Sequence, residues 1–453
     1  MNKEKENPRR NFIKKSALAA TAINLSGMFW ENDAKAMAKV IELSSDKPAS
    51  AQKTVALIAN IYRNSAHADV IATKLFVGIP TDDGMVAPQV KIVSVWIDQI
   101  GDNDTGVRIA EMNGAKMYDT IAGALTLGGD KLAVDAVIYV GEHGEYDKSR
   151  YGIKMYPRMN YLEQIFRVFD ASNKSVPLFN DKHLSYSWLD SKWVYDRAQE
   201  LKVPMMAGSS LPFCWRDQPL EHPLGVKITE AVAIGYHSLD AYGFHVAEIL
   251  QCMVERREGG ETGVKSVLGL GGDDVWKAMD DGRINLDLVT AACNKIKGRE
   301  KGNMRELVKD PNAIIVEYND GTKGAIVLLS GFVNGGWAYA ADTAQGRVAT
   351  EFVLDGSMSY SHFSYLSLNI QKFIVTEKPT APVERTLLTS GISDMGIRSL
   401  VDGEKIETPF LNIKYSAAGF EPIRPTAPRP EGQSIGPWPP KGYEFIIPER
   451  FKK

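Results

Sequence analysis

Residues 54–64, TVALIANIYRN, decide the fold class of this 453-residue chain. The stretch opens with an apolar run to Ala59, which is typical of a buried strand. A turn without glycine follows, and a helical pattern begins at Ala66 and continues to Leu75. A buried strand that leads through a turn into a helix is the repeating unit of a parallel sheet covered on both faces.

The same alternation continues from the first strand to about Ser210. Further strands are predicted at 90–98, 134–140, 176–179 and 203–207, with helices at 106–112, 120–127, 161–169 and 187–201. Near-continuous apolar strands between helices predict an α/β fold with a Rossmann-like, doubly wound parallel sheet. We place this domain at residues 53–210.

The pattern changes after Ser210. Strands are predicted at 228–234, 313–318, 323–329 and 346–353, and helices at 238–257, 364–376 and 383–400. Asn319-Asp320-Gly321-Thr322 predicts a hairpin turn, because Asp-Gly suits positive φ angles. The glycine-rich stretches at 259–263 and 269–272 are interpreted as loops. We therefore expect an α+β domain with a mostly antiparallel sheet at residues 211–419.

The N-terminus predicts an export signal. An arginine pair at 9–10 precedes an apolar stretch at 17–30 and a small-residue cleavage site at 34–36. We assign residues 1–36 to a twin-arginine signal and 37–52 to a linker, and we expect a periplasmic or exported protein with the export machinery as a partner. The alternative interpretation is a basic N-terminal arm of a cytoplasmic protein.

The C-terminal segment, residues 420–453, holds eight of the 22 prolines. Proline cannot continue a helix or a central strand, so an extended arm is expected there, and its large apolar side chains favour a docked arm.

Composition excludes several classes of protein. Lys and Arg number 53 against 56 Asp and Glu, a net charge of −3, which argues against nucleic-acid binding. No window beyond the leader offers about 20 uncharged apolar residues, so no membrane span is predicted. Cys214, Cys252 and Cys293 lack the paired spacing of a zinc site or a disulfide framework.

Three local patterns stand in a fixed order along the chain. NDKHL at 180–184 follows a predicted strand, YGFH at 242–245 lies on the long helix of the second domain, and a helix–linker–helix–strand order runs through 365–415. In this order they resemble the Gfo/Idh/MocA family of sugar and polyol oxidoreductases, over roughly residues 53–415.

The resemblance implies hydride transfer between a carbohydrate or polyol and a tightly bound nicotinamide cofactor. Lys182 stands where the family has a lysine that contacts the reacting hydroxyl, and His245 where it has a general base. A nearby ammonium lowers the effective pKa of an alcohol, and imidazole titrates near working pH.

The family often has Asp four residues before this histidine. Ala241 occupies that position, and Asp240, one residue earlier and about 100° around the helix, is the third predicted catalytic residue. Without the resemblance, Lys182 would be a surface amine and His245 a core histidine.

The predicted cofactor site departs from the usual fingerprint. A dinucleotide-binding turn reads Gly-x-Gly-x-x-Gly directly after the first strand. Here Ala59, Ile61 and Asn64 hold those positions, and Ile61 places a β-branched side chain where the pyrophosphate would lie. Asp98, which is alternatively an ordinary strand end, could bond a ribose hydroxyl and would repel a 2′-phosphate, so NAD is preferred to NADP. The predicted cofactor contacts are Asn60, Ile61, Tyr62, Arg63, Asp98 and His143.

EHGEYD at 142–147 follows the strand predicted at 134–140, so these groups are expected to face the ligand crevice. His143 and Glu145 could bond sugar hydroxyls. No closed set of metal-ligand spacings is present, and no metal is predicted. The predicted substrate contacts are Glu145, His183, Arg216 and His237.

Two other classes of function stay open. The first is a non-redox lyase, hydratase or glycosidase that uses His143, Glu145, Lys182 and His245 in acid–base roles. The second is a binding protein without a cofactor. Family relatives often pair their second-domain sheets face to face, so a homo-oligomer is expected.

Overall fold

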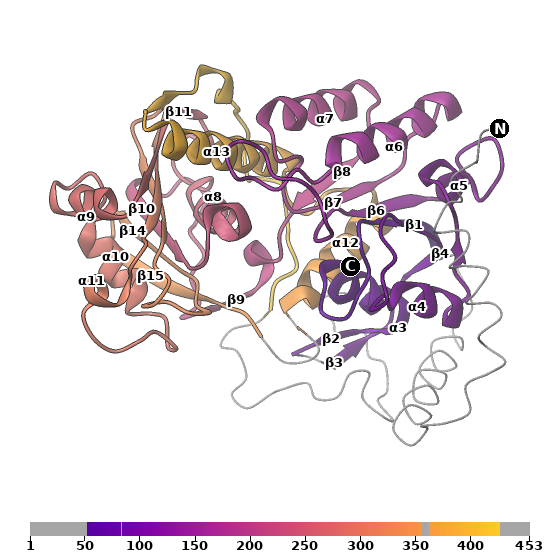
Figure 1. Ribbon diagram of the computed structural model, residues 1–453, viewed down its shortest axis with the longest axis horizontal. Helices are drawn as coiled ribbons and strands as arrows, with labels where there is room; N and C mark the ends of the chain where they lie inside the picture. The colour runs from indigo at the N-terminus through magenta and orange to yellow at the C-terminus, as the bar shows by residue number, and fades with distance from the viewer. Residues whose placement is uncertain (1–51, 83, 356–359, 361, 426–453) are drawn as a thin grey trace, which may run out of the picture.

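Two β-sheets lie side by side in the computed structural model, which describes residues 52–82, 84–355, 360 and 362–425 (Figure 1). The predicted export signal, almost all of the linker and residues 426–453 of the predicted arm lie outside the described residues.

The first sheet has six parallel strands in the order β5-β4-β1-β6-β7-β8. They are β5 (Lys116–Met117), β4 (Val90–Ile97), β1 (Lys53–Ala59), β6 (Ala136–Val140), β7 (Leu178–Asp181) and β8 (Met205–Gly208). The chain builds outward from β1 on one side and then crosses to β6 on the other. This strand order is that of doubly wound dinucleotide folds, in which ligands bind where the order reverses.

Helices cover both faces of the first sheet. Alternate residues of β1 divide between two cores, with Ala56 and Ile58 on one face and Val55 and Leu57 on the other, as the two-residue period of a strand requires. The first face packs against α5 (Ile121–Thr126), α6 (Arg158–Ser172) and α7 (Trp188–Glu200). The second packs against η1 (Asp69–Thr73), α3 (Lys74–Val77), α4 (Gly106–Met112) and α12 (His362–Thr376). A short hairpin, β2 (Ile79–Thr81) and β3 (Gly84–Val86), lies beside α12.

The second sheet has eight strands, all antiparallel to their neighbours except β10 and β13. In spatial order they are β16 (Ile406–Glu407), β11 (Val264–Gly271), β12 (Asn312–Tyr318), β13 (Lys323–Leu328), β10 (Ile228–Gly235), β14 (Ala338–Thr343), β15 (Gly346–Val353) and β9 (Trp215–Asp217). The fold class predicted from the sequence is therefore confirmed.

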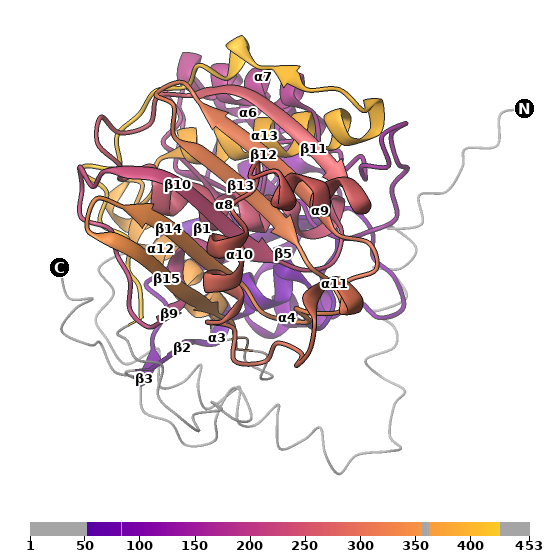
Figure 2. The ribbon, with the colours of Figure 1, turned by 90° about the vertical axis from the view of Figure 1, so that its left-hand side faces the viewer.

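Helices also cover both faces of the second sheet. The longer helices α8 (Phe244–Val254) and α13 (Val383–Asp402) lie between this sheet and the first lobe (Figure 1). On the outer face lie α9 (Asp273–Asp280), α10 (Leu286–Cys293) and α11 (Met304–Leu307), which stand in front of the strands in Figure 2. The sequence interpretation missed these three short helices. They cover much of the face by which the family's sheets were expected to pair.

Two other findings correct the sequence interpretation. Gly269 and Gly271 lie in β11 and not in a loop. A Cβ on Gly269 would meet the carbonyl oxygen of Gly396 at 2.2 Å, so the glycine lets the strand lie directly against α13. In addition, α12 falls inside the predicted second domain, yet it packs against the first sheet.

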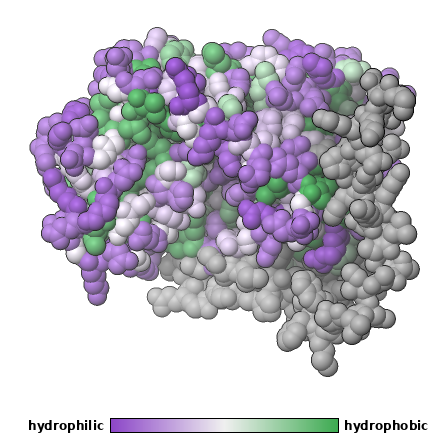
Figure 3. Space-filling view, in the orientation of Figure 1, coloured by the Kyte–Doolittle hydropathy of each residue, from purple (hydrophilic) through white to green (hydrophobic). Residues whose placement is uncertain are grey.

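The described surface is mostly polar. In Figure 3 hydrophilic residues dominate, and apolar groups appear between them. The exposed large apolar side chains come from separate elements: Leu127, Leu189, Leu224, Val375, Val401 and Phe410. Scattered side chains of this kind are normal on a protein surface. Within the described ranges, every helix is too short or too polar to cross a membrane.

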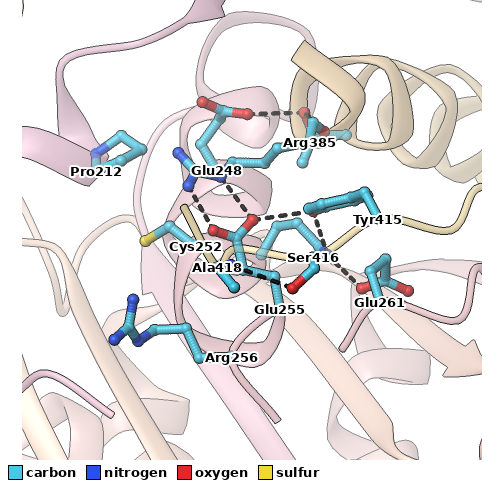
Figure 4. Close-up of polar contacts among 12 residues, drawn as sticks. Pro212, Glu248, Cys252, Glu255, Arg256, Glu261, Arg385, Tyr415, Ser416 and Ala418 are labelled. Carbon is cyan, nitrogen blue, oxygen red and sulfur yellow. Dashed lines mark hydrogen bonds and ion pairs between the residues drawn. The ribbon is translucent and has the colours of Figure 1, made fainter. Parts of the chain in front are cut away.

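Buried charges fix α8 against α13 (Figure 4). Arg385 of α13 donates to Glu255 at the end of α8, with 2.8 Å between Nε and Oε2, and the Tyr415 hydroxyl donates to the same oxygen at 2.9 Å. Two turns earlier on α8, Glu248 accepts a hydrogen bond from the Thr389 hydroxyl at 2.9 Å. These contacts set the position of α8, the helix that carries His245.

The buried Glu248 predicts a pH-dependent stability. Burial raises the pKa of Glu248 from 4.5 to about 7, against the opposing charge of Arg385. Between these two pKa values the folded chain keeps a proton that the unfolded chain has released, so the free energy of unfolding falls as pH rises from about 4.5 to 7. We expect this group to account for about 3 kcal/mol of that fall, and Glu248→Gln to remove it.

Chemical denaturation at pH 5, 6, 7 and 8 measures this effect. Glu258→Gln, at an exposed position near the end of the same helix, is the matched control and should keep the wild-type pH profile. Identical profiles for the wild type and Glu248→Gln would contradict the prediction.

Candidate active site

The carboxyl ends of β1, β6 and β7 lie next to one another at the point where the strand order reverses. Ligands of doubly wound sheets bind at this position. The residues that follow β6 and β7 are chemically rich, with Glu142 and His143 after β6 and Lys182 after β7. His245 joins them from α8 of the second lobe, as its ring contact with His67 shows.

Glu142 anchors two cations beneath the crevice. Its Oε2 lies 2.8 Å from the Nζ of Lys182, and its Oε1 binds the guanidinium of Arg158. Arg158 is fully buried and also donates to the carbonyl oxygen of Asp181 at 2.6 Å. Burial alone would raise the pKa of Glu142, but the charges of Lys182 and Arg158 outweigh it and hold this pKa well below its usual range. Glu142 is therefore a carboxylate that fixes Lys182 in place.

The backbone at the site is held in an uncommon conformation. Lys182 has a φ of 61° and His143 a φ of 62°, in the left-handed region that residues other than glycine seldom adopt. The amide of Lys182 donates to the carbonyl oxygen of Gly208 at 3.0 Å, so the neighbouring strand holds the turn. Strained positions of this kind concentrate at functional sites.

His67 and Asp181 form a second pair. His67 stands at the start of the helical residues 67–77, and Asp181 ends β7. The distance from His67 Nδ1 to Asp181 Oδ2 is 2.7 Å. The Asp181 side chain is fully buried, whereas 13% of the His67 side chain is exposed. The ring of His67 lies 5.4 Å from that of His143 and 6.4 Å from that of His245, between centroids.

The other imidazoles of the cluster are neutral at working pH. Burial, aided by His67, lowers the pKa of His143 to about 4. Burial, aided by Lys182, holds the pKa of His245 well below its usual range, and burial with Arg158 does the same for His183. Among the described residues, the Nδ1 atoms of His183 and His245 have no hydrogen-bond partner. A neutral imidazole can accept a hydrogen bond from a substrate hydroxyl at one ring nitrogen and donate one at the other.

The structure brings together two of the three predicted catalytic residues. Lys182 and His245 are close enough for the lysine charge to act on the histidine. Asp240 has a different partner, because its Oδ1 accepts a hydrogen bond from the amide of Lys154 at 3.1 Å. The acid therefore supports the loop at 148–157 and does not orient His245.

The four predicted substrate contacts lie in four different places. His183 belongs to the cluster, with its ring 5.5 Å from that of Phe244. His237 is exposed, and its ring lies 5.0 Å from that of Tyr242, whose ring is 5.9 Å from that of His245, so His237 lies at the rim. Glu145 lines an outer pocket of about 430 Å³.

Arg216 lies outside the cluster. It comes from β9, at the edge of the second sheet, where it binds Glu221 and stacks at 4.9 Å over Phe352. The prediction that Arg216 contacts the substrate is not supported by this placement.

Two of the four predicted cofactor contacts after β1, Asn60 and Tyr62, are buried and bond to other parts of the first lobe. Asn60 is fully buried and accepts a hydrogen bond from the Tyr139 hydroxyl at 3.3 Å. Tyr62 is buried, bonds Thr73 at 2.6 Å and packs so closely on Gly106 that a Cβ there would lie 2.5 Å from its ring. Ile61 is partly exposed and Arg63 is exposed. The turn is therefore built around a core tyrosine and not around glycine.

The residues present do not fit a dinucleotide in the glycine-turn mode. That mode needs a first helix whose N-terminal amides meet the pyrophosphate, and a carboxylate that meets the ribose. Here Asp69, in the first turn of that helix, accepts a hydrogen bond from the Ser65 amide at 2.9 Å. Asp98, the predicted ribose ligand, accepts one from the Tyr146 hydroxyl at 2.8 Å.

Sequence reasoning missed three residues of the site: His67, Arg158 and Asp181. A signal existed for Asp181, because an acid at the end of a predicted strand and next to Lys182 falls at the ligand edge of the sheet. No local pattern marks Arg158 or His67, since their partners lie 16 and 114 positions away in the chain. Among the described residues, no three or more His, Cys, Asp or Glu side chains are grouped in a way that could hold a metal ion.

Comparison with known proteins supports the fold. No family model and no curated protein matches the chain. Among solved structures it is similar to GenD2 from gentamicin A biosynthesis in complex with NAD, with 13% identity, coverage of 80% of this chain and 97% of that chain, and a TM-score of 0.51.

Two further solved structures are similar at lower scores. A probable dehydrogenase from Thermotoga maritima has 13% identity, 79% and 99% coverage and a TM-score of 0.48. Myo-inositol 2-dehydrogenase from Lactobacillus plantarum has 10% identity, 78% and 99% coverage and a TM-score of 0.49. Likeness at these identities concerns the fold alone, and the chain shares its two-sheet fold with GenD2.

Proposed function

We propose that this chain is an enzyme that acts on a carbohydrate or polyol by acid–base chemistry. One observation carries the proposal: Lys182 held by buried Glu142, and His67 held by buried Asp181, converge where the strand order of the sheet reverses. Glu142, whose pKa is held well below its usual range, is a buried titratable group in a ligand crevice, and such groups are characteristic of catalytic sites.

The chemistry of the groups supports hydroxyl-bearing substrates. A fixed ammonium stabilises negative charge that develops on an oxygen, and imidazoles exchange protons near neutral pH. The neutral rings of His143, His183 and His245 offer further donors and acceptors for neighbouring hydroxyls. The structurally similar GenD2 takes part in the biosynthesis of gentamicin A, and we carry a carbohydrate substrate over from that fold likeness.

The second candidate is a polyol or carbohydrate oxidoreductase with a tightly bound nicotinamide cofactor. It is favoured by the fold, which the chain shares with a protein solved in complex with NAD, and by the proximity of Lys182 and His245. Asp98 would repel a 2′-phosphate, so NAD fits this candidate better than NADP. Such a cofactor would have to be held without the glycine turn.

Turnover without added cofactor tests the proposal. Purified full-length protein is incubated with a panel of glycosides, uronic acids and inositols, and the products are followed by NMR. In parallel, the protein is unfolded and its supernatant is tested for nicotinamide absorbance. We expect turnover with no nicotinamide released. Released nicotinamide with oxidised product would support the second candidate, and binding without any turnover would contradict both.

We also propose export through the twin-arginine pathway, on the strength of the arginine pair and cleavage site in residues 1–36. A homo-oligomer remains a proposal as well. Since α9 and α10 cover the outer face of the second sheet, pairing would involve these helices or another surface.

A further inference from the structure

We propose that the crevice works without a dinucleotide, and that His67, oriented by Asp181, is the base of the reaction. This inference rests on the proposed acid–base function and names the residue that takes the proton. It assigns that role to a side chain of the first helix and not to His245 of the second lobe.

The space that a dinucleotide would need is crossed by bonds within the protein. In a doubly wound sheet the cofactor extends across the strand ends, with its pyrophosphate at the first helix and its ribose beside the acid after the second strand. Here the order of strands is β1-β6-β7, and the 2.7 Å bond between His67 and Asp181 joins the helix after β1 to the end of β7. The pair therefore spans the end of β6, across the expected path.

A second set of bonds crosses the path on the adenosine side. The Tyr146 hydroxyl reaches Asp98 at 2.8 Å and so joins the loop after β6 to the end of β4. The neighbouring Gln99 makes two hydrogen bonds with the backbone of Glu145, at 3.0 Å and 2.8 Å. These bonds connect the same two loops three times, in the place where the ribose would lie.

The helix end that would meet the pyrophosphate already has a negative partner. Both oxygens of Asp69 are engaged, one by the Ser65 amide at 2.9 Å and the other by the Thr73 hydroxyl at 2.6 Å. A carboxylate in the first turn is favourable to the helix and unfavourable to a second anion at the same end.

His67 is the imidazole of the cluster that is oriented to act as a base. Asp181 faces the Nδ1 of His67, and a carboxylate in that position retains the proton on Nδ1 and leaves Nε2 with a free lone pair. The imidazolium formed by proton transfer would be stabilised by the same carboxylate. His245 has no such partner among the described residues, since its Nδ1 is unpaired and Asp240 bonds elsewhere.

The step itself moves one proton. The O–H bond of a substrate hydroxyl breaks, an N–H bond forms at Nε2 of His67, and the electron pair stays on the oxygen. The resulting negative charge faces the ammonium of Lys182, which Glu142 holds at 2.8 Å. The charged or titratable groups around His67 are Asp181, His143 and His245, with Glu142 and His362 close enough to interact with its charge. The Lys182 charge acts on the neighbouring ring of His245.

Binding of NAD⁺ and NADH to the full-length protein tests the first half of the proposal. Calorimetry and NADH fluorescence should show no binding tighter than about 1 mM, and native mass spectrometry should show no dinucleotide on the purified chain. Either a bound dinucleotide or micromolar affinity would overturn the proposal, whether or not a carbohydrate substrate has been found.

Kinetics of His67→Gln and Asp181→Asn test the second half. We expect His67→Gln to lower kcat by about 10²–10⁴-fold with little change in KM. Asp181→Asn should lower kcat and move the acidic limb of the pH profile, which loss of packing alone would not do. Asp196→Asn, on the exposed face of α7, is the control.

The outcomes separate this inference from the proposed function. If the wild type turns over a carbohydrate and His67→Gln, folded by circular dichroism, keeps its activity within about threefold, the base is another residue and the inference fails alone. If His67→Gln does not fold, Asp181→Asn and the dinucleotide titration decide. If the wild type has no turnover, the proposed function fails, and the assignment of His67 as the base fails as well.

Discussion

Replacement of Glu142 by Gln should lower the free energy of unfolding by about 3–5 kcal/mol, the largest change in stability that we expect from one substitution in the site. The neutral amide has nearly the same shape as the carboxylate. It leaves Arg158, which is fully buried, and Lys182, which is nearly so, without their shared counter-charge. Buried cations without a partner are costly, because protein cannot replace the water that they lose.

Urea unfolding at neutral pH measures this change. Glu163→Gln is a matched control, since Glu163 pairs with Arg167 on the exposed side of the same helix that carries Arg158. The control should cost no more than about 0.5 kcal/mol, as exposed ion pairs contribute little. A loss below about 1 kcal/mol for Glu142→Gln would show that the buried pairs do not hold the crevice together.

Replacement of Lys182 by Met should have the opposite profile, with a large loss of activity and a small change in stability. Glu142 keeps Arg158 as a partner, so no buried charge is left alone. Activity should fall because the ammonium that faces the reacting oxygen is gone, and removal of one such group typically costs about 10²–10³-fold in kcat. Lys182→Arg should recover only part of this loss, because a planar guanidinium does not place its charge at the same point.

Steady-state kinetics on the substrate found by the screen measure the effect, with denaturation to confirm that the fold is intact. Lys192→Met, on the surface of α7, controls for the loss of a lysine. If Lys182→Met raised KM and left kcat unchanged, Lys182 would bind substrate without taking part in the chemical step.

The architecture of the first lobe could be predicted because most of its strands are marked by a pattern within their own stretch of sequence. Five of its strands are short apolar runs, and each lies within a few residues of the predicted range, as β1 at Lys53–Ala59 and β4 at Val90–Ile97 show.

The second sheet was harder to predict. Gly269 and Gly271 suggested a loop, since the sequence does not reveal that α13 lies against that strand. The short helices α9 and α10 depend on the outer face of the sheet for their apolar contacts.

The residues of the candidate site could likewise be predicted only in part. Lys182 and His245 could be named because each belongs to a recognisable pattern with a defined place in the fold. Arg158 and His67 could not, because their importance depends on a carboxylate from another strand. Asp240 was predicted as a catalytic residue, but its bond to the amide of Lys154 gives it a different partner, which the sequence does not reveal.

The placement of α12 limits where this chain can be truncated to give a fragment that folds. Residues 362–376 follow almost all of the second sheet in the chain, yet they close the far face of the first one. A fragment that stopped at residue 210 would expose to water the apolar side chains of η1, α3, β2 and β4 that α12 covers, and we expect it to aggregate when expressed alone. The halves should therefore melt in one transition, and neither should be exchangeable with the corresponding half of another protein of this fold.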